Sequence, residues 1–196
     1  MKKIIFDTET TGFKPGSICQ LSYIIDDNGA LTAKNIFFDV EYIEPGAIGV
    51  HGFTVEILRK LSNGCGFRVH ADSILEDFKD ASPLIAHNFD FDKKFLSTEF
   101  DRLGKRLRIQ QNFCTMKYFT PICKLPPTNA YSSYKAKYKY PTLGELVTFF
   151  EITQNEIASF VLELFEIPQG SHFHDARFDA AATYLCYKKA LEQGLI

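Results

Sequence analysis

A short apolar run that ends in two acids constrains the fold more than any other feature of this 196-residue sequence. The run 4–6 (Ile-Ile-Phe) has the character of a buried strand, and it leads directly into Asp7 and Glu9. Because side chains alternate between the two faces of a strand, Asp7 and Glu9 share one face and Thr8 lies on the other. Two carboxylates aimed at one point repel each other unless a cation lies between them. The pair alone therefore leaves two readings: a cation at the carboxyl end of a central strand, or acids that cap a loop or pair with a lysine.

The pattern of apolar residues and turn signals predicts an α/β fold. Antiparallel strands are expected first, with a hairpin turn at Asn28-Gly29, and short buried strands later, at 2–7, 19–26, 35–42, 83–88 and 107–114. Helices are expected at 54–62, 72–80, 91–103, 142–150, 155–165 and from about 175 onward. The proline-rich segment 120–141 is expected to be an irregular arm. This order predicts a mixed five-stranded sheet flanked by helices, within a single domain over 1–196.

Composition excludes several classes of protein. The formal net charge is −2, so no overall positive field attracts a polyanion, which must be held by a local patch or by metal ions. The five cysteines form no CxxC pair, which argues against a disulfide framework or a zinc site and favours a reducing cytoplasm. The first apolar run is too short for a signal peptide, and no run approaches the ~20 apolar residues of a membrane span.

Two later stretches bring further acids. The segment 84–96 is an apolar strand that delivers Asp90 and Asp92 at the start of a helix, where Asp90 is expected to act as a cap. In the segment 172–185, His174 precedes Asp179 by five residues, which on a continuous helix places the two on different faces. They reach one site only if His174 lies just before the helix and Asp179 in its early turns. Asp175 suits the N-cap position that this placement requires.

Together these stretches resemble the DEDD superfamily of 3′→5′ exonucleases, in its histidine-containing, DnaQ-like branch, which includes the proofreading (epsilon) subunit of bacterial DNA polymerase III. The family's three motifs match, in order, Asp7 and Glu9 within DTETTG, His87 and Asn88 with Phe91 and Asp92, and His174 with Asp179. The tyrosine branch would need a tyrosine at position 175, which is Asp. The resemblance extends over nearly the whole chain.

The resemblance implies a ribonuclease H-like fold and hydrolysis of terminal phosphodiesters at nucleic acid 3′ ends, with release of 5′-mononucleotides. It implies two Mg²⁺ or Mn²⁺ ions per site, because the transition state of this reaction concentrates negative charge that cations offset. The expected ligands are Asp7, Glu9, Asp92 and Asp179. His174, whose unperturbed pKa lies near 6.5, is the expected general base for the attacking water.

The resemblance also indicates residues near the substrate, namely Thr8, Thr10, Gly12, His51 and Asn88. Phe13 is expected either to stack on the terminal base or to pack in the core. In the arm, lysines alternate with tyrosines, an arrangement that suits either single-strand binding or a solvated loop; the lysines are Lys135, Lys137 and Lys139.

Two other readings remain open from the sequence. The segment 7–11 also resembles the D-x-D-x-T motif of aspartyl-phosphate phosphatases, in which Asp7 would be a nucleophile. A catalytically silent nucleic-acid-binding or polymerase-accessory module is the second alternative. The sequence does not distinguish DNA from RNA, and it leaves association with a polymerase open, with a standalone nuclease favoured.

Overall fold

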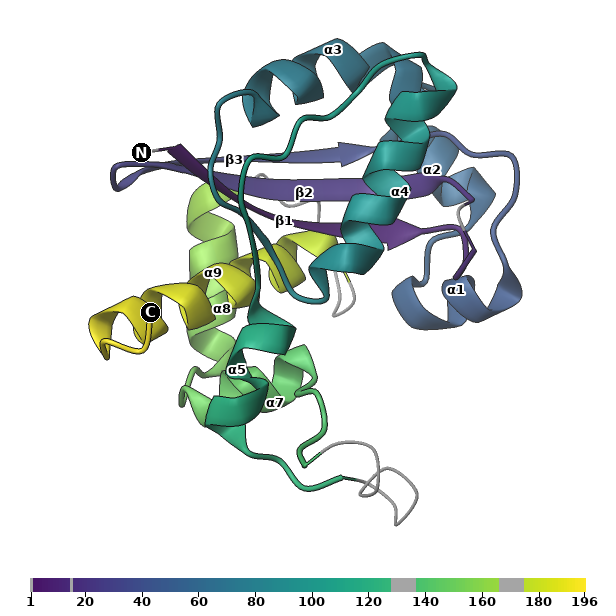
Figure 1. Ribbon diagram of the computed structural model, residues 1–196. Coiled ribbons are helices and arrows are strands. Elements are labelled where there is room, and N and C mark those ends of the chain that lie inside the picture. The colour runs from purple at the N-terminus through teal and green to yellow at the C-terminus, as the bar shows by residue number, and fades with distance from the viewer. Residues whose placement is uncertain (1, 15, 128–136, 166–174) are drawn as a thin grey trace.

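The computed structural model describes residues 2–14, 16–127, 137–165 and 175–196 (Figure 1). At its centre is a five-stranded sheet in the order β3-β2-β1-β4-β5. The strands are β1 (Lys2–Thr10), β2 (Ile18–Asp27), β3 (Ala30–Phe37), β4 (Leu84–Ala86) and β5 (Asn112–Cys114). Strands β1, β2 and β3 pair antiparallel, whereas β4 runs parallel to β1 and β5 parallel to β4. The predicted mixed five-stranded sheet is confirmed.

The predicted hairpin between β2 and β3 is also confirmed. Asn28 and Gly29 form its turn with φ values of 53° and 93°. Both values lie in the left-handed region, which glycine adopts freely and asparagine tolerates better than most residues. The two turn residues therefore match the backbone that a tight hairpin requires.

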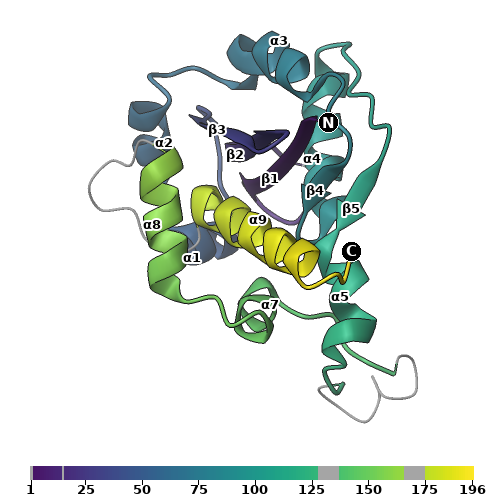
Figure 2. The ribbon, with the colours of Figure 1, turned by 90° about the vertical axis from the view of Figure 1, so that its left-hand side faces the viewer.

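Helices cover both faces of the sheet (Figure 2). One face carries α3 (Phe67–Phe78) and α4 (Phe89–Arg102). The other face carries α5 (Thr115–Cys123), α7 (Leu143–Phe149), α8 (Gln154–Leu164) and α9 (Ala176–Glu192). Two short helices, α1 (Pro45–His51) and α2 (Val55–Leu61), pack with β2 and β3 residues in a smaller apolar cluster. Within the described ranges, no helix combines the length and the apolar character that crossing a membrane demands.

The alternation of side chains along β1 decides on which face the acids lie. Ile4 and Phe6 belong to the apolar cluster that packs under α3 and α4. Ile5 belongs to the cluster under α9, and Asp7 and Glu9 follow it at two-residue intervals on the same face. The acids therefore face the helix layer that contains α9.

Several predicted boundaries are wrong. β1 continues to Thr10, so both acids lie inside the strand, and β3 begins at Ala30 rather than at 35. The strand expected at 107–114 is reduced to Asn112–Cys114, because its partner β4 has only three residues to pair with. Residues 107–110 still alternate between half-buried and exposed side chains, which is the pattern that predicted a strand.

The helices also differ from expectation. α3 begins at Phe67 rather than near 72, and α1 was not predicted because glycines interrupt its apolar pattern. α5 occupies part of the expected irregular arm, with Pro121 inside the helix. A proline costs a helix one internal hydrogen bond, but packing of Phe119 in the core under α9 stabilises this one.

Candidate active site

Three carboxylates from the two ends of the chain meet beside the sheet. Asp7 and Glu9 project from β1, and Asp179 projects from the first turn of α9. Each offers a carboxylate oxygen, and these atoms all lie within 4.8 Å of one another. The convergence arises because α9 packs across β1 and β2 with its N-terminal end at the acidic end of β1.

Asp92, from the first turn of α4, is buried beside β1, and among the neighbouring acids its charge contributes most to the raised pKa of Asp7. Its Oδ1 accepts hydrogen bonds from the Thr8 backbone N–H at 3.1 Å and from the Thr8 hydroxyl at 2.7 Å. β2 pairs with β1 on one side of Thr8, but on the other side β4 ends at Ala86, so the carboxylate takes the N–H that a longer β4 would have bound. Asp92 is thus fixed to the strand that carries the other two acids.

The carboxylates of the cluster repel one another when no cation is bound, and their pKa values are raised. Burial raises the pKa of Glu9 to about 9, and the negative charges of the neighbouring acids add to the effect. Burial and the same neighbours also raise the pKa of Asp7 well above its usual value. Burial raises the pKa of Asp92 to about 7, although the hydrogen bonds from Thr8 act in the opposite direction. Such shifts gather at functional sites, where a bound partner relieves the repulsion.

The donor set fits a hard divalent cation. All three converging groups, Asp7, Glu9 and Asp179, are carboxylates, and oxygen ligands of this kind suit Mg²⁺ or Mn²⁺. In the part of the chain that the structure describes, no thiol or imidazole belongs to this group. The five cysteines are free thiols elsewhere in the fold.

The chain is similar in sequence to subunits of a bacterial DNA polymerase. The chain is 34% identical to the DNA polymerase III epsilon subunit of Buchnera aphidicola over 125 residues, which cover 59% of this chain and 51% of that protein. It is 38% identical to the epsilon subunit of Rickettsia felis over 119 residues, 56% of this chain and 48% of that protein. The resemblance to the DnaQ-like exonucleases is confirmed. No family model matches the chain, and the chain spans about half the length of the epsilon subunits it matches.

The fold agrees as well. The structure of Escherichia coli exonuclease I in complex with a dT13 oligonucleotide superimposes with a TM-score of 0.71 at 17% sequence identity. The match covers 96% of this chain and 40% of exonuclease I. The expected ribonuclease H-like fold is confirmed.

Hydrogen bonds within the segment 7–12 and to α4 hold the region around the first two acids. Thr8, expected near the substrate, faces Asp92, and Thr10 is buried with its hydroxyl donating to the Gly12 carbonyl at 3.0 Å. The Glu44 carboxylate lies directly against Gly12, where a Cβ atom would be 2.3 Å from its Cδ. Glycine at this position therefore leaves room for the acid.

Phe13 is 84% exposed beside this motif. The alternative in which it packs in the core is wrong. This exposed aromatic ring, four residues after Glu9 in the chain, is available to stack on a base.

His51 and Asn88 occupy structural positions. The His51 ring is buried, with Nδ1 accepting from the Phe53 N–H at 3.0 Å and Nε2 at 3.3 Å from the Thr10 carbonyl. Asn88 precedes α4 in the left-handed conformation, with φ of 65°, and its side chain makes no capping hydrogen bond. Asn88 therefore serves the turn between β4 and α4, and the substrate contacts expected of both residues stay predictions.

His87, read from the sequence as a hydrogen bonder at a strand end, links three segments. Its Nε2 donates to the Pro141 carbonyl at 3.1 Å, and its Nδ1 is 2.9 Å from the Thr115 hydroxyl. Burial lowers its pKa to about 4, so the ring is neutral at physiological pH. A neutral ring with one N–H matches one acceptor and one donor.

Of three further residues singled out from the sequence, the structure describes only Asp90. His174 and Lys135 lie outside the described residues. Asp90 is not a cap, because it is exposed and forms an ion pair with Lys117 instead. Its carboxylate points to solvent on the first turn of α4, where a nearby lysine is a better partner than the backbone.

The other two arm lysines have protein partners. Lys137 lies 5.3 Å from the centre of the Tyr138 ring. Lys139 binds both carboxylate oxygens of Glu145, one of them at 2.6 Å. Glu145 also closes the capping box of α7 with Thr142, so Lys139 is tied to that helix.

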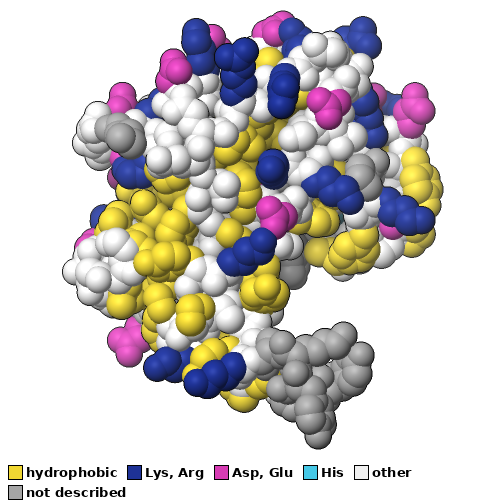
Figure 3. Space-filling model, in the orientation of Figure 1, with side chains coloured by type: hydrophobic (Ala, Val, Ile, Leu, Met, Phe, Trp, Pro, Cys, Tyr) yellow, Lys and Arg dark blue, Asp and Glu magenta, His cyan; other side chains and the backbone are white. Residues whose placement is uncertain are grey.

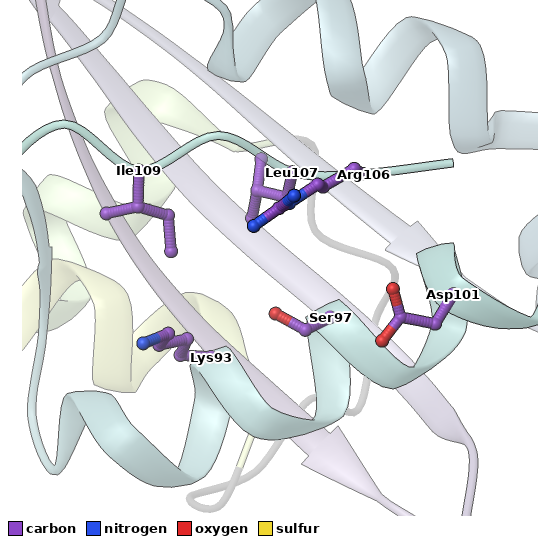
Figure 4. Close-up of a pocket in the computed structure, with 6 residues that line it drawn as sticks. All are labelled: Lys93, Ser97, Asp101, Arg106, Leu107 and Ile109. Carbon is purple, nitrogen blue, oxygen red and sulfur yellow. The ribbon is translucent and has the colours of Figure 1, made fainter. Parts of the chain in front are cut away.

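A hollow on the α4 face is separate from the acidic cluster (Figure 4). It lies between α4 and the segment that follows, and it is lined by Lys93, Ser97, Asp101, Arg106, Leu107 and Ile109. Figure 3 shows that basic side chains on this face are interspersed with acidic ones rather than gathered in one patch. The face therefore carries no uniform positive field.

Sequence reasoning did not assign Gln20 or Arg177 to the site. The signal for Gln20 was present, because a glutamine interrupts the otherwise apolar strand 18–25 together with Ser22. Gln20 is completely buried and reaches the start of α9. A polar side chain in a buried strand needs partners, and the identity of those partners is visible only in the fold.

Proposed function

We propose that residues 1–196 form one metal-dependent 3′→5′ exonuclease domain that removes 5′-mononucleotides from nucleic acid ends, mainly single-stranded ones. The observation that carries the proposal is the convergence of Asp7, Glu9 and Asp179, with Asp92 fixed beside them by Thr8. The similarity to epsilon subunits over more than half of the chain supports the same activity.

The acids would hold a pair of Mg²⁺ or Mn²⁺ ions, one at Asp7, Glu9 and Asp179 and the other at Asp7 and Asp92. When bound, such ions offset charge on the phosphate and lower the pKa of the attacking water. His174 would take the proton from that water, since an imidazole near its ordinary pKa suits general base catalysis at neutral pH. The cluster does not need a nucleophilic residue, and the proposal includes no covalent intermediate.

The single-strand preference is supported by the exposed ring of Phe13, which follows Glu9 by four residues in the chain. A free base can stack on such a ring, whereas a paired base has its faces covered by its neighbours. One solved structure with this fold holds a dT13 oligonucleotide. We propose single-stranded 3′ ends as the preferred substrate.

The relation to a polymerase is a separate proposal. The relatives are named as subunits of DNA polymerase III, whereas exonuclease I, which shares the fold, is named as an exonuclease and not as a polymerase subunit. We propose that the nuclease acts on free ends by itself, and co-purification with a replicative polymerase would contradict this part.

An end-labelled panel of single- and double-stranded DNA and RNA tests the activity. With Mg²⁺ or Mn²⁺, 5′-labelled single strands should shorten stepwise, and 3′-labelled strands should release a labelled mononucleotide at once. His174→Ala should lower turnover by ~10²-fold or more. The matched control is Asp72→Asn, which changes an exposed acid paired with Lys105. Cleavage inside the strand, release of 3′-mononucleotides, or activity with excess chelator would overturn the proposal.

A further inference from the structure

A buried hydrogen-bond network joins β2 to the first turn of α9. The Gln20 Nε2 donates to Asp175 Oδ1 at 2.7 Å, and the Gln20 Oε1 accepts from the Ala176 N–H at 3.1 Å. One side chain thus binds both the cap of the helix and one of its free N–H groups. Asn35 on β3 supports this arrangement, since its Oδ1 accepts from Gln20 at 2.8 Å and from the Ser22 hydroxyl at 2.6 Å.

The network lies directly beside the acidic cluster. In the β1–β2 ladder Gln20 is the partner of Glu9, and Ser22 is the partner of Asp7. Cross-strand partners have side chains on the same face of a sheet, so Gln20 lies between Glu9 and the N-terminal end of α9. The strand that positions Glu9 and the helix that positions Asp179 are therefore connected through one glutamine.

Arg177 completes the network with a buried charge. Its Nε and Nη2 donate to the two oxygens of Asp175, at 2.9 Å and 2.5 Å, while its own backbone N–H donates to Oδ1 at 3.0 Å as the capping bond. The side chain is 2% exposed. A buried guanidinium carries a large desolvation cost, which the bidentate pairing offsets only in good geometry.

A packing role alone does not require this chemistry, because apolar residues of similar size fill a core at lower cost. Asp175 faces the acidic cluster closely enough for its charge to act on Asp7 and Glu9. The guanidinium of Arg177 offsets that charge, so the cap adds rigidity without adding a full fifth negative charge to the site.

We propose that Gln20, Asp175 and Arg177 form a positioning unit that fixes the first turn of α9 against β1 and thereby sets the distance between the carboxylates of Glu9 and Asp179. The unit acts through these two acids and touches no substrate. Its consequence for turnover rests on the proposed function, but its consequence for cation binding does not.

Gln20→Met is the test variant, since methionine has a similar length but cannot donate to Asp175 or accept from Ala176. Tyr23→Phe is the matched control, because Tyr23 lies on the opposite face of the same strand and loses one hydrogen bond, to Asp77 at 2.6 Å. Asn35→Ala is a milder second variant that removes only the outer support. Each protein is compared by thermal unfolding, by its Mn²⁺ concentration at half-maximal stabilisation, and by amide exchange of metal-free protein.

Gln20→Met should raise the Mn²⁺ midpoint ~10-fold or more and speed amide exchange at residues 176–179, as loss of a supporting residue does at other metal sites. The midpoint for Asn35→Ala should shift in the same direction by less. Tyr23→Phe should keep the wild-type Mn²⁺ midpoint and the wild-type amide exchange in α9, even if its melting temperature falls as much as that of Gln20→Met. On single-stranded DNA, Gln20→Met should lower kcat with little change in KM.

The outcomes separate the two proposals. If wild-type protein degrades no nucleic acid, the proposed function falls, while the Mn²⁺ midpoint and the amide exchange still decide the positioning unit. If Gln20→Met unfolds, Asn35→Ala decides it by the same two measurements. If Gln20→Met, or Asn35→Ala in its place, has the same Mn²⁺ midpoint and the same α9 amide exchange as Tyr23→Phe, the network serves only packing. That result would overturn the inference.

Discussion

Thr8 donates both its backbone N–H and its hydroxyl to one oxygen of Asp92, a residue 84 positions further along the chain. The contact joins β1 to α4 at the point where β4 stops, so the fourth acid is oriented by the strand that carries the first two. It also explains why a threonine lies between the acids. Its hydroxyl favours the ionised form of a buried carboxylate, which burial alone would keep protonated.

Thr8→Val should move the pH dependence of turnover. Without the hydroxyl, the pKa of Asp92 should rise further above about 7, so the acidic limb of the pH–rate profile should shift to higher pH. At neutral pH turnover should fall ~10-fold. Thr8→Ser keeps the hydroxyl and is the control; a Thr8→Val profile that overlays the wild-type one would show that this bond does not tune Asp92.

Asp179→Asn should abolish turnover and the stabilisation by Mg²⁺, while the metal-free protein keeps or gains thermal stability. Removal of one charge relieves the repulsion that raises the pKa values of Asp7 and Glu9. Thermal unfolding with and without Mg²⁺ measures both effects, and Asp72→Asn again serves as the control. Retained turnover would remove Asp179 from the site.

Stability of the metal-free protein should fall as pH rises. The pKa of Glu9 is about 9 in the folded protein, against about 4.3 for an unfolded chain. Between these two values the folded state binds more protons than the unfolded state, so the free energy of unfolding decreases with increasing pH. Cation binding needs the ionised form, and the rise in melting temperature with Mg²⁺ should therefore be larger at about pH 8.5 than at about pH 6.

Glu9→Gln tests the source of that dependence. The variant lacks the titrating group, so its metal-free stability should vary less between about pH 6 and pH 8.5 than that of the wild type. Circular dichroism melts of both proteins in the same buffers measure this. An equal slope for the two proteins would mean that other groups cause the effect.

Phe13→Ala should weaken binding of single-stranded substrates without loss of stability. The ring is 84% exposed, so its removal leaves no cavity. A stacked base contributes about 1–3 kcal/mol, and KM for a short oligonucleotide should rise ~10-fold if the terminal base stacks there. Tyr42→Ala removes another exposed aromatic ring, one outside the first motif, and should leave KM unchanged. Equal KM values for the two variants would assign no substrate contact to Phe13.

The arm lysines should contribute unequally to salt dependence. Lys139 is engaged with Glu145, whereas Lys137 lies over an aromatic ring and keeps its charge at the surface. Changing Lys135 and Lys137 together to Gln should reduce the slope of log affinity against log salt by about 1.4 for a single strand. Lys139→Gln should leave the slope unchanged. Fluorescence anisotropy with a labelled oligonucleotide, in Ca²⁺ or chelator, measures the salt dependence of binding for each variant. A slope that the double change leaves unaffected would support the alternative in which the arm is a solvated loop.

Local patterns in the sequence were sufficient for the elements that set the site in place. Alternation along 4–9 determined that Asp7 and Glu9 share a face, and the acid at 175 was correctly predicted as the cap of the last helix. The turn at Asn28-Gly29 was equally local. Each of these follows from backbone geometry over a few residues, which is why the sequence alone could predict them.

Only the tertiary structure decided which groups meet those elements. Thr8 pairs with Asp92, and Gln20 binds the start of α9, so both contacts join segments from distant parts of the chain. The burial of the Arg177 guanidinium likewise depends on the packing of the fold. Short strands such as β5 and proline-containing helices such as α5 likewise depend on what packs against them. Periodicity states which face of an element is buried, but the partner that buries it is chosen by the packing of the whole fold.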